Sequence, residues 1–359
     1  MKVTIKVSLA SIFFLAVFFA LFSAADSKST SSDRLYALKL DSPPNEFDWE
    51  NAQPFIVVAK NGNLHELHKA VDVDADSVHT STASCHHAAP IAPPVTITLK
   101  AYYTKDELFL KVKWLDLTKD DAMFEYEFSD DKWNTSKKLE DALGIMWDLS
   151  YGKKPFNCSI ACHATDWKLK DYSLVSKFRM GIKGSDMVDL WNWSAYRTNT
   201  FNFADDRYIN EDGVLPDTPS RIYFYNTDRV TSAPVAESAR DITPLSEGDT
   251  PVYDYNGMKI ADGYWMLTGK APGIRIVMPN GNRADVRALG AYEKSKWEVT
   301  FSRALINEDN KDVTFNVKRD NIYKFGLAVF DNTLTNHYAV EEPVELVFVD
   351  ANKVDAKNN

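Results

Sequence analysis

The chain has 359 residues, of which 41 are Lys or Arg and 51 are Asp or Glu, so its formal net charge is −10 at pH 7. This balance excludes a nucleic-acid binder, because no basic face can be assembled against acidic residues spread along the whole chain. A hydrophobic content of 45% is ample for a full core and excludes a disordered protein. Three cysteines are too few for a disulfide framework, so the interest lies in where they fall.

The first 25 residues have the features of a secretory signal peptide. Lys2 and Lys6 give a positive start, residues 7–22 form a predominantly apolar run, and the small residues 23–25 offer a cleavage site. An uncleaved anchor is the alternative, although the run falls short of the ~20 residues that cross a bilayer. We therefore predict an exported protein, located in the periplasm or an equivalent extracytoplasmic compartment. No membrane span is expected in the mature chain, because no other stretch is long and apolar enough.

Strand-type alternation dominates the mature chain. In residues 108–114, apolar side chains occupy every second position, while Lys111 and Lys113 point away from them. The same pattern recurs in residues 95–99, 297–301, 323–329 and 344–348. Helical periodicity is confined to short pieces, around residues 136–142 and after His163. Many short strands with long irregular inserts predict an all-β fold of the sandwich type.

We expect one elaborated domain over residues 26–350, followed by a disordered polar tail over residues 351–359. Two inserts interrupt the strand pattern. Residues 61–94 carry five of the seven histidines, and residues 205–257 are acidic and rich in Pro, Asp and Ser. Loops of this length in a compact domain are usually functional or wrap a partner. Within the second insert we expect Asp205-Asp206 to form a solvated turn, with a calcium-binding pair as the alternative.

The strongest chemical signal is Cys158-Ser-Ile-Ala-Cys162-His163. Covalent haem attachment needs two thiols that reach the two vinyl groups and an adjacent imidazole that binds the iron, usually as C-x-x-C-H. This sequence has one extra residue between the cysteines, and the longer loop can still span the vinyl groups. A disulfide and a partial zinc site are the alternatives. A disulfide leaves the adjacent histidine unexplained, and zinc lacks a second cysteine pair. We therefore predict haem c, which agrees with the export signal.

A second feature is Cys85 followed by His86 and His87, within the histidine-rich insert. This group is either a second haem or iron site, or a source of a distal ligand, or a solvated loop in which histidines accumulate. The sequence leaves these possibilities open.

Tryptophans recur at alternating positions of the predicted strands, including Trp147, Trp191 and Trp193. Such residues can line a haem pocket, but they are more often core, so we assign a pocket role to none of them.

A set of short segments extends over most of residues 47–348. They are 100–116 (KAYYTKDELFLKVKWLD), 143–148 (LGIMWD), 179–181 (RMG), 188–193 (VDLWNW), 204–206 (ADD), 284–288 (ADVRA), 297–303 (WEVTFSR) and 325–331 (FGLAVFD). With this ensemble, the chain resembles the haem-binding domain of ethylbenzene dehydrogenase-type gamma subunits, also described as a DMSO reductase-like haem-binding domain. The resemblance implies an immunoglobulin-like β-sandwich that holds one haem near an edge.

The resemblance also implies axial ligands. In family members that carry haem b, a Met and a Lys hold the iron. The Met precedes a Gly just before the W-x-W strand and corresponds to Met180. The Lys lies in the turn after the A-V-F-D strand, where this sequence has His337 instead. An imidazole at that position still suits low-spin haem iron.

Two arrangements are open. In the first, one haem c is attached at Cys158 and Cys162, with His163 proximal and His337 distal, and Met180 is a packing residue. In the second, Met180 and His337 hold the family's original haem, while His163 and one of His86 and His87 hold an added haem c. The first is simpler, whereas the second explains the histidine-rich insert and Cys85.

The resemblance implies an electron-transfer subunit beside a molybdenum catalytic subunit and an iron–sulfur subunit. The added cysteines favour the gamma subunits of nitrite oxidoreductases of anammox-type bacteria, whose compartment would be the anammoxosome lumen. We expect a chain that shuttles electrons and does no substrate chemistry itself, and whose acidic surface suits docking of a basic soluble cytochrome c. The alternatives are a free-standing periplasmic cytochrome c and a carbohydrate- or ligand-binding sandwich, because fold does not fix function.

Overall fold

The computed structural model describes residues 33–61, 93–130, 132–154, 156, 182, 186–210, 212–226, 270–317, 321–332 and 337–350. Apart from Asp33, these residues belong to one compact unit, Arg34–Asn359. The predicted signal peptide, the predicted tail and nearly all of the histidine-rich insert lie outside the described residues. Among the described residues, no helix is long and apolar enough to cross a membrane.

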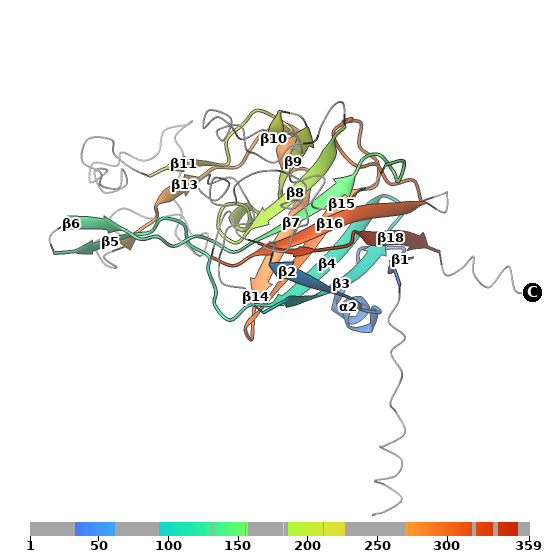
Figure 1. Ribbon diagram of the computed structural model, residues 1–359, viewed down its shortest axis with the longest axis horizontal. Helices are drawn as coiled ribbons and strands as arrows, with labels where there is room; N and C mark the ends of the chain where they lie inside the picture. Colours follow the sequence, from blue (N-terminus) through green and yellow to red (C-terminus); the bar gives the residue numbers. More distant parts are fainter. Residues whose placement is uncertain are drawn as a thin grey trace, which may run out of the picture. The chain divides into compact units, whose positions relative to one another are not determined.

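The described chain is almost entirely β-structure (Figure 1), so the prediction of an all-β, immunoglobulin-like sandwich with a few short helices is confirmed. The strands are β1 (Leu35–Lys39), β2 (Phe55–Asn61), β3 (Val95–Tyr103), β4 (Glu107–Leu115), β5 (Tyr126–Ser129), β6 (Lys132–Thr135), β7 (Ala142–Asp148), β8 (Val188–Ser194), β9 (Asp205–Asn210), β10 (Gly213–Pro216), β11 (Tyr223–Tyr225), β12 (Lys270–Ala271), β13 (Ile274–Ile276), β14 (Arg287–Tyr292), β15 (Lys296–Ala304), β16 (Ile322–Phe330), β17 (Tyr338–Val340) and β18 (Val344–Val349). The helical elements are α2 (Glu46–Asn51) and the short 3-10 turns η2 (Asn199–Phe201) and η4 (Gly281–Ala284).

One continuous sheet folds over itself to give two facing layers. Its strand order is β10-β9-β8-β7-β16-β17-β2-β3-β4-β15-β14. The layer of β3, β4, β15 and β14 faces the layer of β16, β7 and β8, because the inward side chains of both groups meet in one core. Two short strand pairs also join the layers along one side. The β17–β2 pair links one end of β16 to β3, and the β18–β1 pair links the other end.

Tryptophans fill the space between the layers. The ring centroid of Trp193 on β8 lies 6.1 Å from that of Trp114 on β4 and 5.1 Å from that of Trp297 on β15, both edge to face. Trp147 and Trp191 are fully buried in the same core, with centroids 5.0 Å apart. Aromatic pairs of this geometry add ~0.5–1.5 kcal/mol each beyond the area that they bury. The interpretation of these tryptophans as core residues is confirmed.

The helix predicted over residues 136–142 is wrong. This stretch is extended and leads into β7, because backbone hydrogen bonds fix it to neighbouring chain: Ser136 donates to the carbonyl of Glu125, and Asp141 donates to that of Asp120. Conversely, α2 was not expected. Its start is fixed by a capping box in which Asn45 and Asp48 each accept the other's backbone N–H. The helical piece expected after His163 lies outside the described residues.

The predicted irregular insert over residues 205–257 begins as regular structure. Strands β9, β10 and β11 lie within it, and the residues from 227 to 257 are not described. Asp205 and Asp206 are buried in β9, so the prediction of a solvated turn is wrong. The side chain of Asp205 forms ion pairs with Arg283 and Arg207. In β9 these buried aspartates stand at positions where buried strands usually have apolar residues, so the sequence lacks the hydrophobic pattern that predicts a strand.

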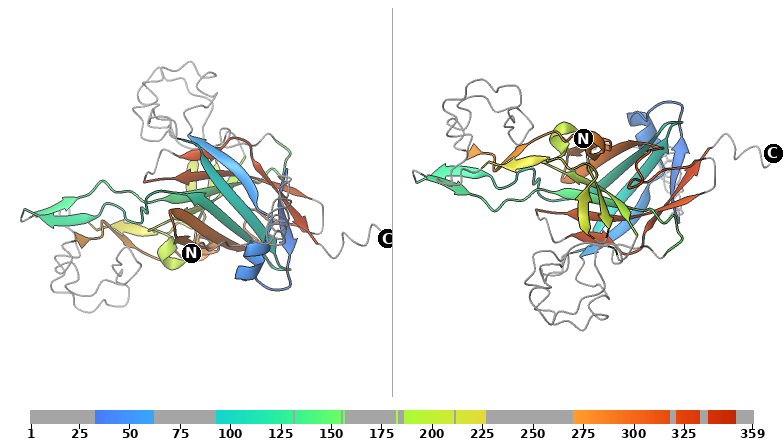
Figure 2. Two further views of the ribbon diagram at one scale, coloured as in Figure 1. Left: turned by 90° about the horizontal axis from the view of Figure 1, so that it is seen from below. Right: turned by 90° about the horizontal axis from the view of Figure 1, so that it is seen from above.

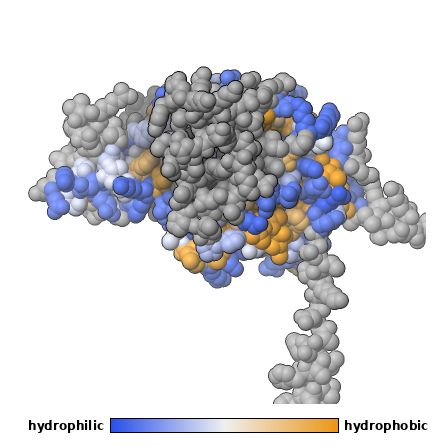
Figure 3. Space-filling model, in the orientation of Figure 1, coloured by the Kyte–Doolittle hydropathy of each residue, from blue (hydrophilic) through white to orange (hydrophobic). Residues whose placement is uncertain are grey.

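Strands β5 and β6 form a hairpin that, with β12, makes a separate small sheet projecting from the main one (Figures 1 and 2). Phe128 on this hairpin and Tyr225 on β11 are exposed. Ile56 and Val58 on β2 and Leu289 on β14 are also exposed. Figure 3 shows apolar surface (orange) on the lower part of the molecule in this view. Exposed apolar surface of this kind often marks a contact with a partner.

Gly290 in β14 is a point at which the core admits no side chain. A Cβ there would lie 2.2 Å from Cζ2 of Trp193, and the side-chain amide of Asn199 also fixes the Gly290 backbone through both its N–H and its carbonyl. We expect Gly290→Ala to lower the free energy of unfolding by ~1–3 kcal/mol in urea denaturation. Leu289→Ala, in the exposed neighbour, is the control and should change it by no more than ~0.5 kcal/mol. Equal effects of the two variants would contradict this account.

Candidate functional site

The face of the β8–β7–β16–β17 layer that points away from the tryptophan core carries small and apolar side chains. We call it the outer face. Across the strands, Gly144 lies opposite Asn192 on one side and Ala328 on the other, and Ala328 lies opposite Ala339. Directly opposite residues of an antiparallel pair share a face. Three of the four positions in this row therefore have no side chain larger than a methyl group.

Larger apolar side chains border this row. Met146 and Leu190 belong, together with Ala339 of the row, to one buried hydrophobic cluster that is separate from the tryptophan core. A Cβ on Gly144 would lie 3.8 Å from Cδ1 of Leu190 and 4.0 Å from Cε2 of Phe330, so both side chains adjoin the glycine. The outer face thus offers a flat floor of backbone and methyl groups with an apolar rim.

His337 lies at the margin of the outer face. It directly precedes β17, it is only 6% exposed, and its ring centroid is 5.0 Å from that of Phe330. Since Phe330 adjoins Gly144, the imidazole lies beside the small-residue row.

Of the residues predicted from the sequence, His337 is the one within the described part of the chain. The others lie outside it: Cys85, His86, His87, Cys158, Cys162, His163 and Met180. The described residues nearest to the ends of the segment 157–181 are Phe156 and Ile182, and both pack in the hydrophobic cluster of the outer face. Ile182 also donates its backbone N–H to the carbonyl of Asn210, 3.0 Å away. The chain therefore enters and leaves this segment at the outer face.

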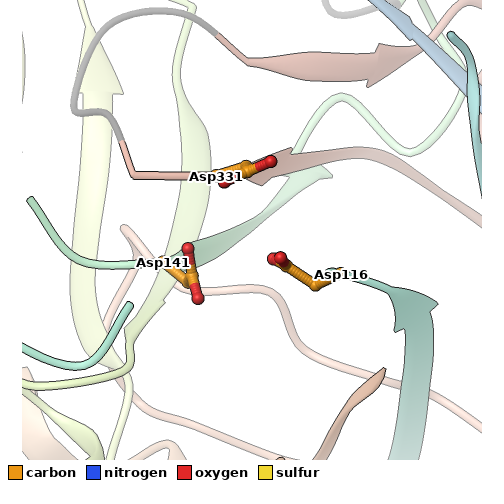
Figure 4. A group of neighbouring side chains, drawn as sticks. All are labelled: Asp116, Asp141 and Asp331. Atoms are coloured by element: carbon orange, nitrogen blue, oxygen red, sulfur yellow. The ribbon is translucent and has the colours of Figure 1, made fainter. Parts of the chain in front are cut away.

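Three carboxylates lie together near the ends of separate strands (Figure 4). Asp116 follows β4, Asp141 precedes β7 and Asp331 follows β16, and one oxygen of each lies within 4.8 Å of the others. Asp141 accepts hydrogen bonds from Nε1 of Trp297 (2.8 Å) and from the backbone of Asp120 (2.8 Å) and Asn332 (3.1 Å). Oδ2 of Asp116 is buried and accepts no hydrogen bond from the described residues.

Burial and mutual repulsion raise the pKa values of this trio. Burial, and then the charge of Asp116, raises the pKa of Asp141 to about 8. Burial, and then the charge of Asp331, raises the pKa of Asp116 to about 6, and burial also raises the pKa of Asp331. This group was not predicted from the sequence. Its one available signal is that each aspartate stands immediately beside an apolar strand.

A family model described as ethylbenzene dehydrogenase matches residues 46–340. The chain belongs to the ethylbenzene dehydrogenase family. The family predicted from the sequence is thereby confirmed, and family membership makes the chain an oxidoreductase-associated protein. The matched region includes the outer face, His337 and the three carboxylates. The narrower assignment to nitrite oxidoreductase gamma subunits stays a prediction.

Solved structures similar to this ethylbenzene dehydrogenase family member include carbohydrate-binding modules of very low identity. A family 9 carbohydrate-binding module from Caldicellulosiruptor kristjanssonii in complex with glucose is 9% identical, with a TM-score of 0.32, and the match covers 88% of this chain and 96% of that one. A module of the same family and organism in complex with cellotriose is 10% identical, with a TM-score of 0.29 and coverage of 89% and 96%. At these TM-scores the likenesses carry no argument about function. No curated protein matches the chain.

The carboxylate trio predicts a pH dependence of stability. Because the folded pKa values lie above the ordinary value of ~3.9, the stabilising contribution of these groups is complete below that pH. It is lost as the pH rises through about 6 for Asp116 and about 8 for Asp141. Asp116→Asn removes one charge, so the fall in unfolding free energy between about pH 5 and about pH 9 should shrink by ~1–3 kcal/mol. Urea denaturation at both pH values measures it. Asp130→Asn, at the exposed hairpin tip, is the control, and an undiminished fall in Asp116→Asn would refute the account.

Proposed function

We propose that this protein is an exported haem-carrying electron-transfer subunit whose haem binds against the outer face. The observation that carries the proposal is the position of three described residues in one patch. Phe156, Ile182 and Ala339 come from distant parts of the sequence and pack in the same hydrophobic cluster.

Each of these residues stands two positions from a candidate haem-binding group. Cys158 follows Phe156, Met180 precedes Ile182, and His337 precedes Ala339. Two residues of fully extended chain span at most ~7 Å. The chain length therefore limits each candidate's Cα to about that distance from the Cα of its described neighbour in the patch. Haem attachment and iron ligation use thiols, thioethers and imidazoles, and these are the groups that Cys158, Met180 and His337 carry.

The outer face suits the shape of a haem. A flat macrocycle can approach the sheet closely where Gly144, Ala328 and Ala339 leave no bulky side chain, and the ring of Phe330 lies beside them. A bound haem supplies a one-electron carrier. The residues of this chain supply ligands to the iron, and the apolar rim excludes water, which together set the reduction potential.

Both ligand arrangements derived from the sequence are compatible with this face, and His337 is an iron ligand in each. His163 is its partner in the one-haem arrangement, and Met180 is its partner in the two-haem arrangement. Of these two arrangements, only the one with two haems gives a role to His86 or His87 and explains Cys85.

The partners follow from the same proposal. Family membership supports assembly with an oxidoreductase, for which we propose a molybdenum subunit and an iron–sulfur subunit, as in nitrite oxidoreductase. The projecting β5–β6 hairpin with exposed Phe128 is a suitable contact for such a subunit. The net charge of −10 favours a basic soluble cytochrome c as a second electron partner.

Covalent attachment is tested by replacing Cys158 and Cys162 together with Ala. We expect wild-type mature protein to stain for haem on denaturing gels and the double variant not to stain, because the two thiols form the bonds to the vinyl groups. Pyridine haemochrome analysis against protein concentration then counts the haems. Haem b found beside haem c in the wild type identifies the two-haem arrangement, and haem c alone at one per chain identifies the one-haem arrangement. Cys85→Ala is the matched thiol control and should retain the stain. A colourless wild-type band ends the haem c proposal.

Axial ligation is tested at His337. His337→Ala is expected to convert the ferric haem that it binds from low spin to high spin, because one strong-field ligand is removed, and added imidazole should restore the low-spin absorption spectrum. His79→Ala, in the histidine-rich insert, serves as the control and should leave the spectrum unchanged. If His337→Ala folds and keeps a fully low-spin spectrum, His337 is not a ligand.

A further inference from the structure

A second group of buried carboxylates lies on the core side of β8 and β9, away from the outer face. We call it the aspartate cluster, and its members are Asp189 on β8, Asp206 on β9, Asp217 after β10, and Asp309 and Asp312 in the loop after β15. They form two overlapping triads. In the inner triad, oxygens of Asp189, Asp206 and Asp312 lie within 4.8 Å of one another, and in the outer triad the same holds for Asp217, Asp309 and Asp312.

Several oxygens of this cluster accept no hydrogen bond from the described residues. Asp217 is only 7% exposed, yet neither of its carboxylate oxygens has a donor. The same is true of both oxygens of the fully buried Asp206, and of Oδ1 of Asp312. A buried carboxylate without donors is strongly unfavourable unless a cation or a proton compensates for it.

Arginine compensates the inner triad. Nη2 of Arg303 lies 2.7 Å from Oδ2 of Asp312 and 3.7 Å from Oδ2 of Asp206, and it also reaches Asp285 at 3.5 Å. Its Nη1 donates to the carbonyl of Val313 at 2.9 Å, so the guanidinium is held among these carboxylates.

In the outer triad, Arg303 pairs with Asp312, which both triads share, but no Lys or Arg of the described residues forms an ion pair with the carboxylate of Asp217. Nζ of Lys311 lies 3.2 Å from Asp309, but at Asp217 it reaches only the backbone carbonyl, 2.8 Å away. With Asp285 included, six carboxyl groups face two cations, Arg303 and Lys311. Burial, and then the interaction with the carboxyl group of Asp217, raises the pKa of Asp312 to about 8. The buried side chain of Asp217 is the member of the outer triad that has no ion-pair partner among the described residues.

We propose that the outer triad of Asp217, Asp309 and Asp312 binds one calcium ion. All three donors are carboxylate oxygens, which hard cations prefer, and Ca²⁺ binds six to eight oxygens at ~2.3–2.6 Å. Oxygens on opposite sides of such an ion lie up to ~5 Å apart, which agrees with the spacing within 4.8 Å. Asp309 is half-buried, so the ion and its water ligands have access from solvent. Bound there, the ion ties the loop after β15 to the end of β10.

The outer triad could be compensated either by a calcium ion or by a proton shared between its carboxylates. The variant Asp217→Asn distinguishes these two explanations. Asn has the same size and removes a charge from a group with excess negative charge. Without calcium, the variant should therefore unfold at a higher temperature than the wild type. With millimolar Ca²⁺ the order should reverse, because the melting temperature of the wild type rises by about 5 °C and that of the variant does not. A purely structural role of Asp217 would not produce this reversal.

Glu308→Gln is the matched control, because Glu308 is exposed in the same loop and lies outside the cluster. Its response to Ca²⁺ should equal that of the wild type. Terbium luminescence of the wild type, sensitised by aromatic residues such as Tyr208 beside Lys311, gives a second readout that needs no variant. One Tb³⁺ per chain displaced by Ca²⁺, and far less readily by Mg²⁺, supports the site. An absent Ca²⁺ response in the wild type, an equal response in Asp217→Asn, or equal displacement by Mg²⁺ overturns it.

Discussion

The contact of Trp193 with Trp114 and Trp297 fixes the distance between the two layers, and the position of every other feature follows from it. Trp193 of one layer meets Trp114 and Trp297 of the other layer edge to face, and the latter two rings are stacked on each other within the core. At protein packing densities such a core leaves no space for a prosthetic group. A ligand the size of a haem therefore has to bind outside the sandwich. Side chains of a strand alternate between its two faces, so β7 and β8 present tryptophans inward and Gly144, Met146 and Leu190 outward.

Buried charge is the second constraint on this fold, and it is connected to the first. Asp141 accepts a hydrogen bond from Nε1 of Trp297, which links the carboxylate trio to the core. Asp331 ends β16, and the chain that follows it leads to His337. Burial, and then the charges of Asp331 and Asp116, raises the pKa of the Tyr338 hydroxyl, and Tyr338 is the residue next to His337. In the proposed site, negative charge on the carboxylate trio would favour the oxidised form of an iron bound by His337, because local charge tunes haem potentials.

Much of the fold could be predicted from the sequence, because long strands with one buried face carry an alternating pattern. Strand β15 follows this pattern throughout and β16 follows it over most of its length, whereas in β4 Phe109 and Lys111 of the opposite face are buried as well. The prediction failed where a local pattern gave the wrong signal. Strand β9 contains buried Asp206 in place of an apolar residue, and residues 136–142 are held extended by backbone partners distant in the sequence.

Only part of the candidate functional site could be predicted from the sequence. His337 could be singled out from the sequence because the family resemblance places an iron ligand in that turn. Asp116, Asp141 and Asp331 could not, since three single aspartates at the ends of separate strands form a group only when the topology brings those ends together. The aspartate cluster has the same origin, because its members come from β8, β9, the end of β10 and the loop after β15. Such clusters are a property of tertiary structure and leave no spacing pattern in the chain.

The two proposed sites use opposite faces of one strand. On β8, Asp189 and Trp191 point into the core side, whereas Val188 and Leu190 pack on the outer face. Asp189 accepts hydrogen bonds from Nε1 of Trp191 and from the backbone of Val313, so the loop that carries Asp309 and Asp312 is attached to β8 directly. An ion that fixes this loop would restrain β8 from its inner side without touching a ligand on its outer side. Calcium would then affect haem retention only by making β8 more rigid. The two sites would share no contact, but binding at one would stabilise the strand that the other uses.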